Sequence, residues 1–201
     1  MVSQLATAVT TLFFNREMMI LAGEIGVAAI TIIIYSQFLL STLYIGYSMG
    51  VAPVIGYNYG SKNTTQQKRI FRICMGFITV TSLVVFSLCL LGNKYIIMLF
   101  ADSSSEVYNL AQNGFSIFAY SFLFCGLNIF TCAMFTSLSN GKISAILSLL
   151  RTFGFVTAGL LILPKLCGII GVWLAVPVAE SIVFIISIIY IIHYRKQYAY
   201  M

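Results

Sequence analysis

Long apolar runs alternate with short polar segments along the whole chain. A helix rises roughly 1.5 Å per residue, so a run of about 20 apolar residues can cross the hydrocarbon core of a membrane. The runs are continuous, whereas barrel strands alternate apolar and polar residues, so helices are favoured. The pattern predicts an all-α integral membrane fold, a six-transmembrane-helix bundle, with residues 1–201 as a single membrane domain. The expected spans are approximately 1–21, 26–55, 73–93, 107–137, 143–163 and 169–192.

Polar and helix-breaking segments agree with these limits. A basic connector over residues 61–72 follows the second span, and a Gly-Asn pair at 92–93 marks the end of the third. Residues 102–106 form a polar connector with N-cap chemistry for the fourth span. Residues 139–142 predict a turn before the fifth span, and the Pro-Lys and Gly residues within 164–168 separate the last two spans.

The composition excludes a soluble domain. Sixty per cent of the residues are hydrophobic and 8% are charged, against about 25% charged residues in soluble domains. The net charge of +6 could suggest nucleic acid, but the basic residues lie between apolar runs, where the membrane interface explains them better. The five cysteines form no C-x-x-C pair and the chain has one histidine, so we expect no metal site and no nucleic-acid partner.

The charged residues between the spans predict an orientation in the bilayer. Connections on one side carry seven basic residues and those on the other side carry three, together with all four acids of the connections. The seven are Lys62, Lys68, Arg69, Arg72, Lys142, Arg195 and Lys196, and the three are Arg16, Lys94 and Lys165. By the positive-inside rule, the side with seven faces the cytoplasm. With an even number of spans, both termini are expected there.

Two charged residues fall inside predicted spans. Arg151 and Glu180 are costly in lipid, and such residues usually face the interior of a bundle. Counted along their helices, their depths differ by roughly 5 Å, which is within the reach of an arginine side chain. We therefore expect the two to form an ion pair. The pair is either a structural fastening or a contact that is broken and remade during transport.

The second predicted span is rich in helix-breaking residues. Pro53, Gly56 and Gly60 follow a pair of glycines at small-x-x-x-small spacing, which indicates either close helix packing or a bent helix beside a transport pathway. Pro177 predicts another kink, three residues before Glu180.

Polar uncharged residues recur inside the spans. Gln4, Gln37 and Asn128 stand within the first, second and fourth spans. They predict either hydrogen bonds between helices or the lining of a water-filled cavity. No nucleophile, zinc-protease or phosphate-loop motif occurs in the sequence, so we expect no enzymatic activity.

The stretch of residues 50–63 reads GVAPVIGYNYGSKN. It resembles the segment after the eighth helix of multidrug and toxic compound extrusion (MATE) transporters, where a P-x-x-G-Y-N-Y-G pattern opens a basic cytoplasmic loop. Residues 148–151 are similar to that family's eleventh helix, and residues 168–180 to its twelfth. The nearest resemblance is to the bacterial branch of DinF-like and MepA-like proteins.

The resemblance implies twelve helices in two six-helix lobes, of which this chain matches the C-terminal lobe only. It implies a multi-pass protein of the bacterial plasma membrane that exports organic cations or drugs against proton or sodium entry, with no other cofactor. Such a lobe would need an N-terminal lobe or a second copy as partner, because alternating access rocks one repeat against the other. The alternatives are a truncated fragment without transport activity and a lipid-linked oligosaccharide flippase. The P-x-x-G-Y-N-Y-G segment favours drug extrusion over the flippase.

Overall fold

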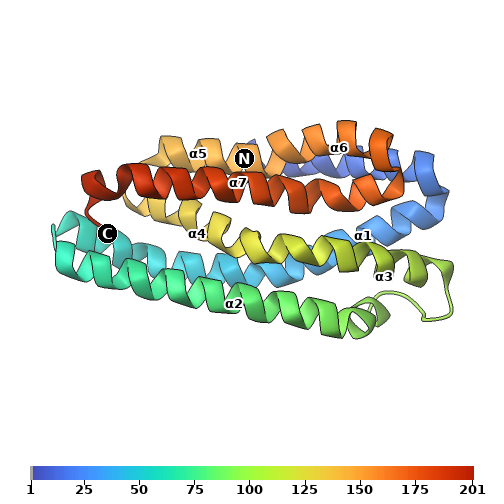
Figure 1. Ribbon diagram of the computed structural model, residues 1–201, viewed down its shortest axis with the longest axis horizontal. Helices are drawn as coiled ribbons and strands as arrows, with labels where there is room; N and C mark the ends of the chain where they lie inside the picture. The colour runs from blue at the N-terminus through green and yellow to red at the C-terminus, as the bar shows by residue number, and fades with distance from the viewer. Residues whose placement is uncertain (1) are drawn as a thin grey trace.

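The computed structural model describes residues 2–201, with side chains described from Leu5 onward, and every regular element in that range is helical. The long helices run side by side in one elongated bundle (Figure 1). The elements are α1 (Val2–Gly60), α2 (Thr64–Met98), α3 (Glu106–Phe118), η1 (Ala119–Ser121), α4 (Phe122–Ser137), α5 (Gly141–Leu149), η2 (Leu150–Gly154), α6 (Phe155–Cys167) and α7 (Ile169–Tyr198).

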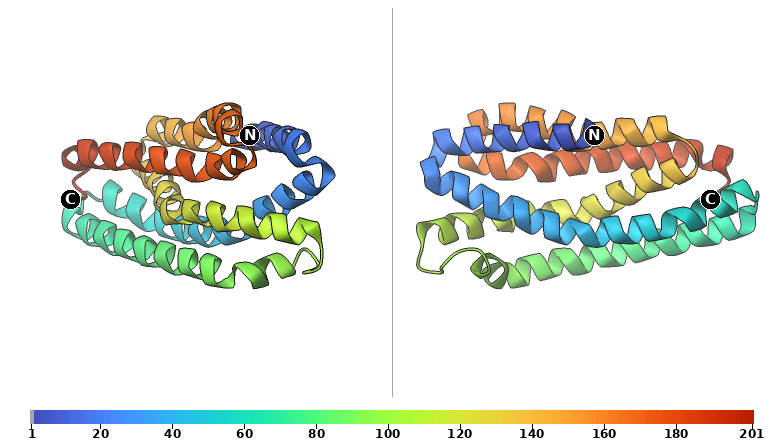
Figure 2. Two further views of the ribbon diagram at one scale, coloured as in Figure 1. Left: turned by 45° about the vertical axis from the view of Figure 1, so that its right-hand side comes forward. Right: turned by 180° about the vertical axis from the view of Figure 1, so that it is seen from behind.

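Helix α1 folds back on itself at Gly23. Gly23 has φ 60° and ψ −149°, a backbone conformation open to glycine and strained for other residues. We call residues 2–22 the first arm and residues 24–60 the second arm. A straight helix of 59 residues would be roughly 88 Å long, far more than a bilayer needs. Figure 2 shows the first arm running to one end of the bundle and the second arm returning from it.

Five continuous helical stretches in the described residues are long and apolar enough to cross a membrane. The first contains both arms of α1. In the third, α3 and α4 are joined through the 3₁₀ turn η1, and in the fourth, α5 and α6 are joined through the π-helical segment η2. The expected all-α membrane bundle is therefore present. The expected number of six crossings depends on counting the two arms separately.

Several helices extend beyond the predicted span limits. The connector expected over 61–72 is helical from Thr64 onward, because Asn63 caps α2 by accepting a hydrogen bond from the Gln66 amide. The helix of the third predicted span does not end at Asn93. Asn93 lies inside α2, which continues to Met98, and its amide donates to the Gln112 carbonyl at 2.9 Å. Hydropathy marks the lipid-facing part of a helix, whereas backbone capping sets its ends.

The helices do not break at Pro53 or Pro177. The helical backbone continues through Pro53 and Gly56 in α1 and through Pro177 in α7, and within α1 only Gly23 departs from helical φ/ψ. Gly60 is the last residue of α1, and Lys62, two residues on, takes the left-handed conformation with φ 56°. The Gly46-x-x-x-Gly50 pair does not mediate packing inside this bundle, because an added Cβ at either glycine would meet nothing within 4 Å.

Large aromatic side chains fill the core around α4. The fully buried ones include Tyr44, Phe115, Phe118, Phe122, Phe130, Phe135 and Trp173. Gly114 of α3 allows the indole of α7 to approach closely, since a Cβ there would lie 2.7 Å from two ring atoms of Trp173. α4 lies between the other helices (Figures 1 and 2), and this central place keeps Asn128 and Thr131 out of contact with lipid.

The two ends of the bundle differ in charge. The α1–α2 turn, the α4–α5 turn and the C-terminus lie at one end, which we call the basic end (Figure 1). The turn between the arms of α1, the α2–α3 connection and the α6–α7 junction lie at the other. The seven basic residues grouped by sequence therefore belong to connections and helix turns at the basic end, and the four acids of the connections belong to the opposite end.

Candidate functional site

An ion pair joins η2 to α7 inside the bundle. The guanidinium Nη1 of Arg151 donates to Oε1 of Glu180 at 3.0 Å. The Glu180 side chain is 4% exposed and that of Arg151 is 18% exposed. The pairing predicted from helix depth is thus confirmed, and it is the one salt bridge found in the described part of the chain.

Asn128 of α4 completes the coordination of Glu180. Its Nδ2 donates to Oε2 of Glu180 at 2.7 Å and to the Glu180 backbone carbonyl at 3.0 Å. Its Oδ1 accepts a hydrogen bond from the Ser187 hydroxyl at 3.1 Å. Both Asn128 and Ser187 are fully buried. Glu180 therefore meets a donor at each carboxylate oxygen, which lowers the cost of burying it.

Arg151 belongs to the π-helical segment η2. The amide of Phe155 donates to the carbonyl of Leu150, five residues back, as a π-helix requires. The Thr152 carbonyl accepts a hydrogen bond from the Thr10 hydroxyl of the first arm at 3.1 Å, so the first arm contacts this segment directly. A single π-helical turn inserted in an α-helix frequently occurs at functional sites. The same segment can also adopt ordinary α-helical hydrogen bonding, which gives it a second conformation.

Cys125 links the ion pair to the second arm of α1. Arg151 Nη1 lies 3.6 Å from the sulfur of Cys125, and the Ser41 hydroxyl lies 3.8 Å from the same sulfur. Nε of Arg151 is buried without a hydrogen-bond partner. We call Arg151, Glu180, Asn128, Ser187 and Cys125 the ion-pair network. It connects α4, η2 and α7 and reaches α1.

The other predicted site residues lie outside this network. Gln37 is half-buried on the second arm, one helical turn before Ser41, and no hydrogen bond to it is found among the described residues. Gln4 lies in α1, but its side chain falls outside the described ones. Pro177 is buried one turn before Glu180, and its carbonyl accepts a hydrogen bond from the Ser181 hydroxyl at 2.7 Å.

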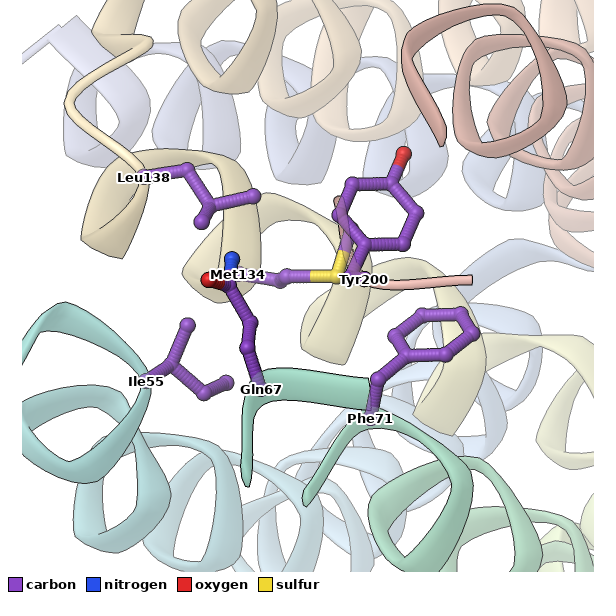
Figure 3. A pocket seen from close by; sticks show the side chains of 6 residues that line it. All are labelled: Ile55, Gln67, Phe71, Met134, Leu138 and Tyr200. Carbon is purple, nitrogen blue, oxygen red and sulfur yellow. The ribbon is translucent and has the colours of Figure 1, made fainter. Parts of the chain in front are cut away.

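A small cavity lies away from the network. It has a volume of about 10 Å³, room for roughly one water molecule, and Figure 3 shows its lining side chains. They are Ile55, Gln67, Phe71, Met134, Leu138 and Tyr200. Tyr200 donates to the Ile191 carbonyl at 2.7 Å and so holds the C-terminal segment against the basic end. No cluster of three or more metal-ligating side chains is found among the residues described.

Comparisons with known proteins show the family of this chain. The model of the MatE family matches residues 1–159, most of the chain. The chain belongs to the MatE family. None of the curated proteins compared with it matches. Its long apolar helices agree with the integral membrane fold of that family.

Solved structures share the fold of this MatE chain. It is similar to an outward-facing multidrug resistance MATE transporter of the MOP superfamily, with a TM-score of 0.89 and 20% identity over 100% of this chain and 45% of that one. An inward-facing MATE transporter matches with a TM-score of 0.89 and 20% identity, over 98% and 46%. A MOP superfamily transporter from Pyrococcus furiosus matches with a TM-score of 0.84 and 21% identity, over 94% and 43%. The chain thus spans less than half the length of these transporters.

Sequence reasoning on the MatE chain found Arg151, Glu180 and Asn128 but missed Ser187 and Cys125. Ser187 is seven residues after Glu180, two helical turns along the same face, which is a signal that could have placed it beside Asn128. Cys125 is three residues before Asn128, so it also shares that residue's side of α4. A cysteine in an apolar run ordinarily indicates a small core residue, and no sequence pattern distinguished this one.

Proposed function

We propose that this chain is the C-terminal lobe of a proton- or sodium-coupled antiporter that exports organic cations or drugs, and that it acts together with a second lobe. The ion-pair network is the observation that carries the coupling part of the proposal. The family match and the P-x-x-G-Y-N-Y-G segment support the export part. The match to less than half of each solved transporter supports the need for a second lobe.

An exposed face on the second arm of α1 fits the place of that second lobe. Large apolar and aromatic side chains recur along it at helical spacing, with small residues between them. The large members are Tyr35, Phe38, Leu39, Leu43, Met49 and Tyr57, and Gly46, Gly50 and Pro53 lie among them. Aromatic faces attract organic cations, so this surface is suited to line a drug cavity between two lobes.

Six crossings follow from this proposal. The two arms of α1 are two of them, and the four remaining long helical stretches supply the rest. The basic end then faces the cytoplasm of a bacterial cell by the positive-inside rule, and both termini are proposed to lie on that side.

Rigid rocking of the lobe accounts for alternating access. The chain resembles an outward-facing and an inward-facing transporter equally well, with a TM-score of 0.89 in both cases. A lobe that fits both states can act as one unit that moves against its partner. Pro53, Gly56, Gly60 and Pro177 remain candidate hinges, in which a small backbone change would open or close one end.

In this proposal, ion entry is coupled to export because the proton or sodium ion competes with Arg151 for the Glu180 carboxylate. A proton or sodium ion that binds the carboxylate neutralises the charge that holds Arg151, so the guanidinium is released. Arg151 can respond because its Nε has no hydrogen-bond partner and its backbone lies in the π-helical segment. Asn128 keeps its bond to the Glu180 backbone carbonyl when the carboxylate changes state, so α4 and α7 stay together.

Ethidium accumulation in cells tests the proposal. The chain is expressed alone and together with an N-terminal MatE lobe, and accumulation is compared at equal membrane expression. We expect lower accumulation with both lobes, and loss of that effect in Glu180→Gln at unchanged expression. The control Glu24→Gln removes an exposed acid beside the turn in α1 and should export normally.

If Glu180→Gln lowers expression and Arg151→Met with Glu180→Leu restores it, the pair is structural only. No export with any partner lobe would indicate a truncated fragment.

A further inference from the structure

A row of basic residues occupies the first turns of α2. Thr65, Lys68, Arg69 and Arg72 follow one another at positions i, i+3, i+4 and i+7, so they share one face of the helix. All four side chains are exposed. Together with Thr64 they line an open hollow of about 570 Å³ at the basic end. We call this the cationic groove.

No acidic residue balances the cationic groove. The chain has five acids, of which four lie at or near the opposite end and the fifth is Glu180 in the ion-pair network. The one salt bridge of the described residues does not involve α2. Lys62 in the turn just before the helix adds further positive charge. Uncompensated cations that lie close together attract a multivalent or phosphate-bearing anion.

An apolar stripe continues directly from the cationic groove along α2. Its members follow Arg69 and Arg72 at the same helical spacing, and all are exposed, from 49% for Phe77 to 84% for Leu91 at the far end. The stripe consists of Ile73, Phe77, Val80, Val84, Leu88 and Leu91. In a membrane protein such a stripe lies against acyl chains, and the groove then lies at the depth of the lipid headgroups.

We propose that the cationic groove binds the headgroup of an anionic phospholipid whose acyl chains lie along the apolar stripe of α2. The guanidinium groups of Arg69 and Arg72 are suited to bidentate contact with phosphate oxygens, and the Lys68 ammonium adds a point charge. The Thr65 hydroxyl supplies a neutral donor. A lipid is the occupant that satisfies both features, because a soluble phosphate would leave the stripe unused. The proposal does not depend on the transport activity.

Native mass spectrometry of the purified chain in a neutral detergent tests this lipid site. The probes are a phosphatidylglycerol and a phosphatidylcholine with identical acyl chains, titrated separately. The site variant is Arg69→Gln with Arg72→Gln. The matched control is Arg195→Gln with Lys196→Gln, which removes the same charge from exposed residues at the same end. We expect the site variant to bind phosphatidylglycerol roughly tenfold to thirtyfold more weakly, and the control to bind it as the unmodified chain does.

Three results would overturn the lipid site. If the control loses as much affinity for phosphatidylglycerol as the site variant does, the binding depends on net charge and not on the groove. Equal binding of phosphatidylcholine would mean that the headgroup charge does not matter. Displacement of phosphatidylglycerol by an equal concentration of glycerol 3-phosphate would mean a soluble-anion site. The variant Arg69→Lys with Arg72→Lys guards against misfolding, because it keeps the charge and should retain most of the affinity; loss equal to that of the glutamine variant contradicts the proposal.

Discussion

Separating the two members of the buried ion pair gives a quantitative test of the network. Arg151→Met leaves the Glu180 carboxylate buried with only the Asn128 amide as partner. Removing one partner of a buried pair costs about 3–5 kcal/mol, and the remaining hydrogen bond from Asn128 puts this case at the lower end, about 3 kcal/mol. Glu180→Leu leaves a guanidinium that is 18% exposed, so its cost is lower, about 2 kcal/mol.

The double variant should be less damaged than the sum of the single variants. Arg151→Met with Glu180→Leu removes both charges, and Asn128 keeps its bond to the backbone carbonyl at 3.0 Å. The lost side-chain hydrogen bond costs about 1–2 kcal/mol. The coupling energy between the sites is then about 3 kcal/mol or more, measured by a denaturant unfolding cycle in detergent micelles. Additive effects of the two substitutions would refute the assignment of Glu180 and Arg151 as a buried, interdependent pair.

Three further predictions concern packing, the turn of α1 and the C-terminus. Gly114→Ala should cost about 1–3 kcal/mol of stability in the same assay, because its Cβ would lie 2.7 Å from the indole of Trp173; an unchanged midpoint would contradict this packing. Gly23→Ala should cost about 1–3 kcal/mol through the strained backbone at φ 60°, and equal stability would mean a different turn. Burial raises the pKa of Tyr200 above 10.0, so its contribution to stability is full below about pH 10 and falls as the pH rises towards the raised value. Tyr200→Phe should therefore lose less stability at alkaline pH than the unmodified chain. Identical dependence of the unfolding free energy on pH in the two proteins would contradict the burial of a neutral Tyr200.

Helix depth could be predicted from the sequence, whereas helix rotation could not. The rise per residue was enough to place Arg151 opposite Glu180, and the ion pair confirms it. Asn128 was recognised as a polar residue in a span, but large apolar residues surround α4 on all sides, so no periodicity indicated which face meets α7. The contact with Glu180 needed the packed structure.

Local backbone irregularities were the features least visible in the sequence. The predicted boundary between 21 and 26 was close to the turn at Gly23, although hydropathy gave no information on its backbone conformation. The π-helical segment at Arg151 leaves no mark in the hydrophobic pattern, since it changes hydrogen bonding by one residue. Pro53 and Pro177 suggested kinks, but a helix can continue through proline when neighbouring helices support the freed carbonyl.

Gradient-driven ethidium flux in proteoliposomes tests the central claim most directly. The chain is reconstituted with an N-terminal MatE lobe, a proton or sodium gradient is imposed, and the Glu180→Gln variant is compared with the unmodified chain. The account predicts that one of the two gradients drives ethidium movement, that the variant abolishes the response, and that the chain without a partner lobe gives none. Equal flux through the unmodified and Glu180→Gln forms, or flux that is indifferent to both gradients, would contradict it.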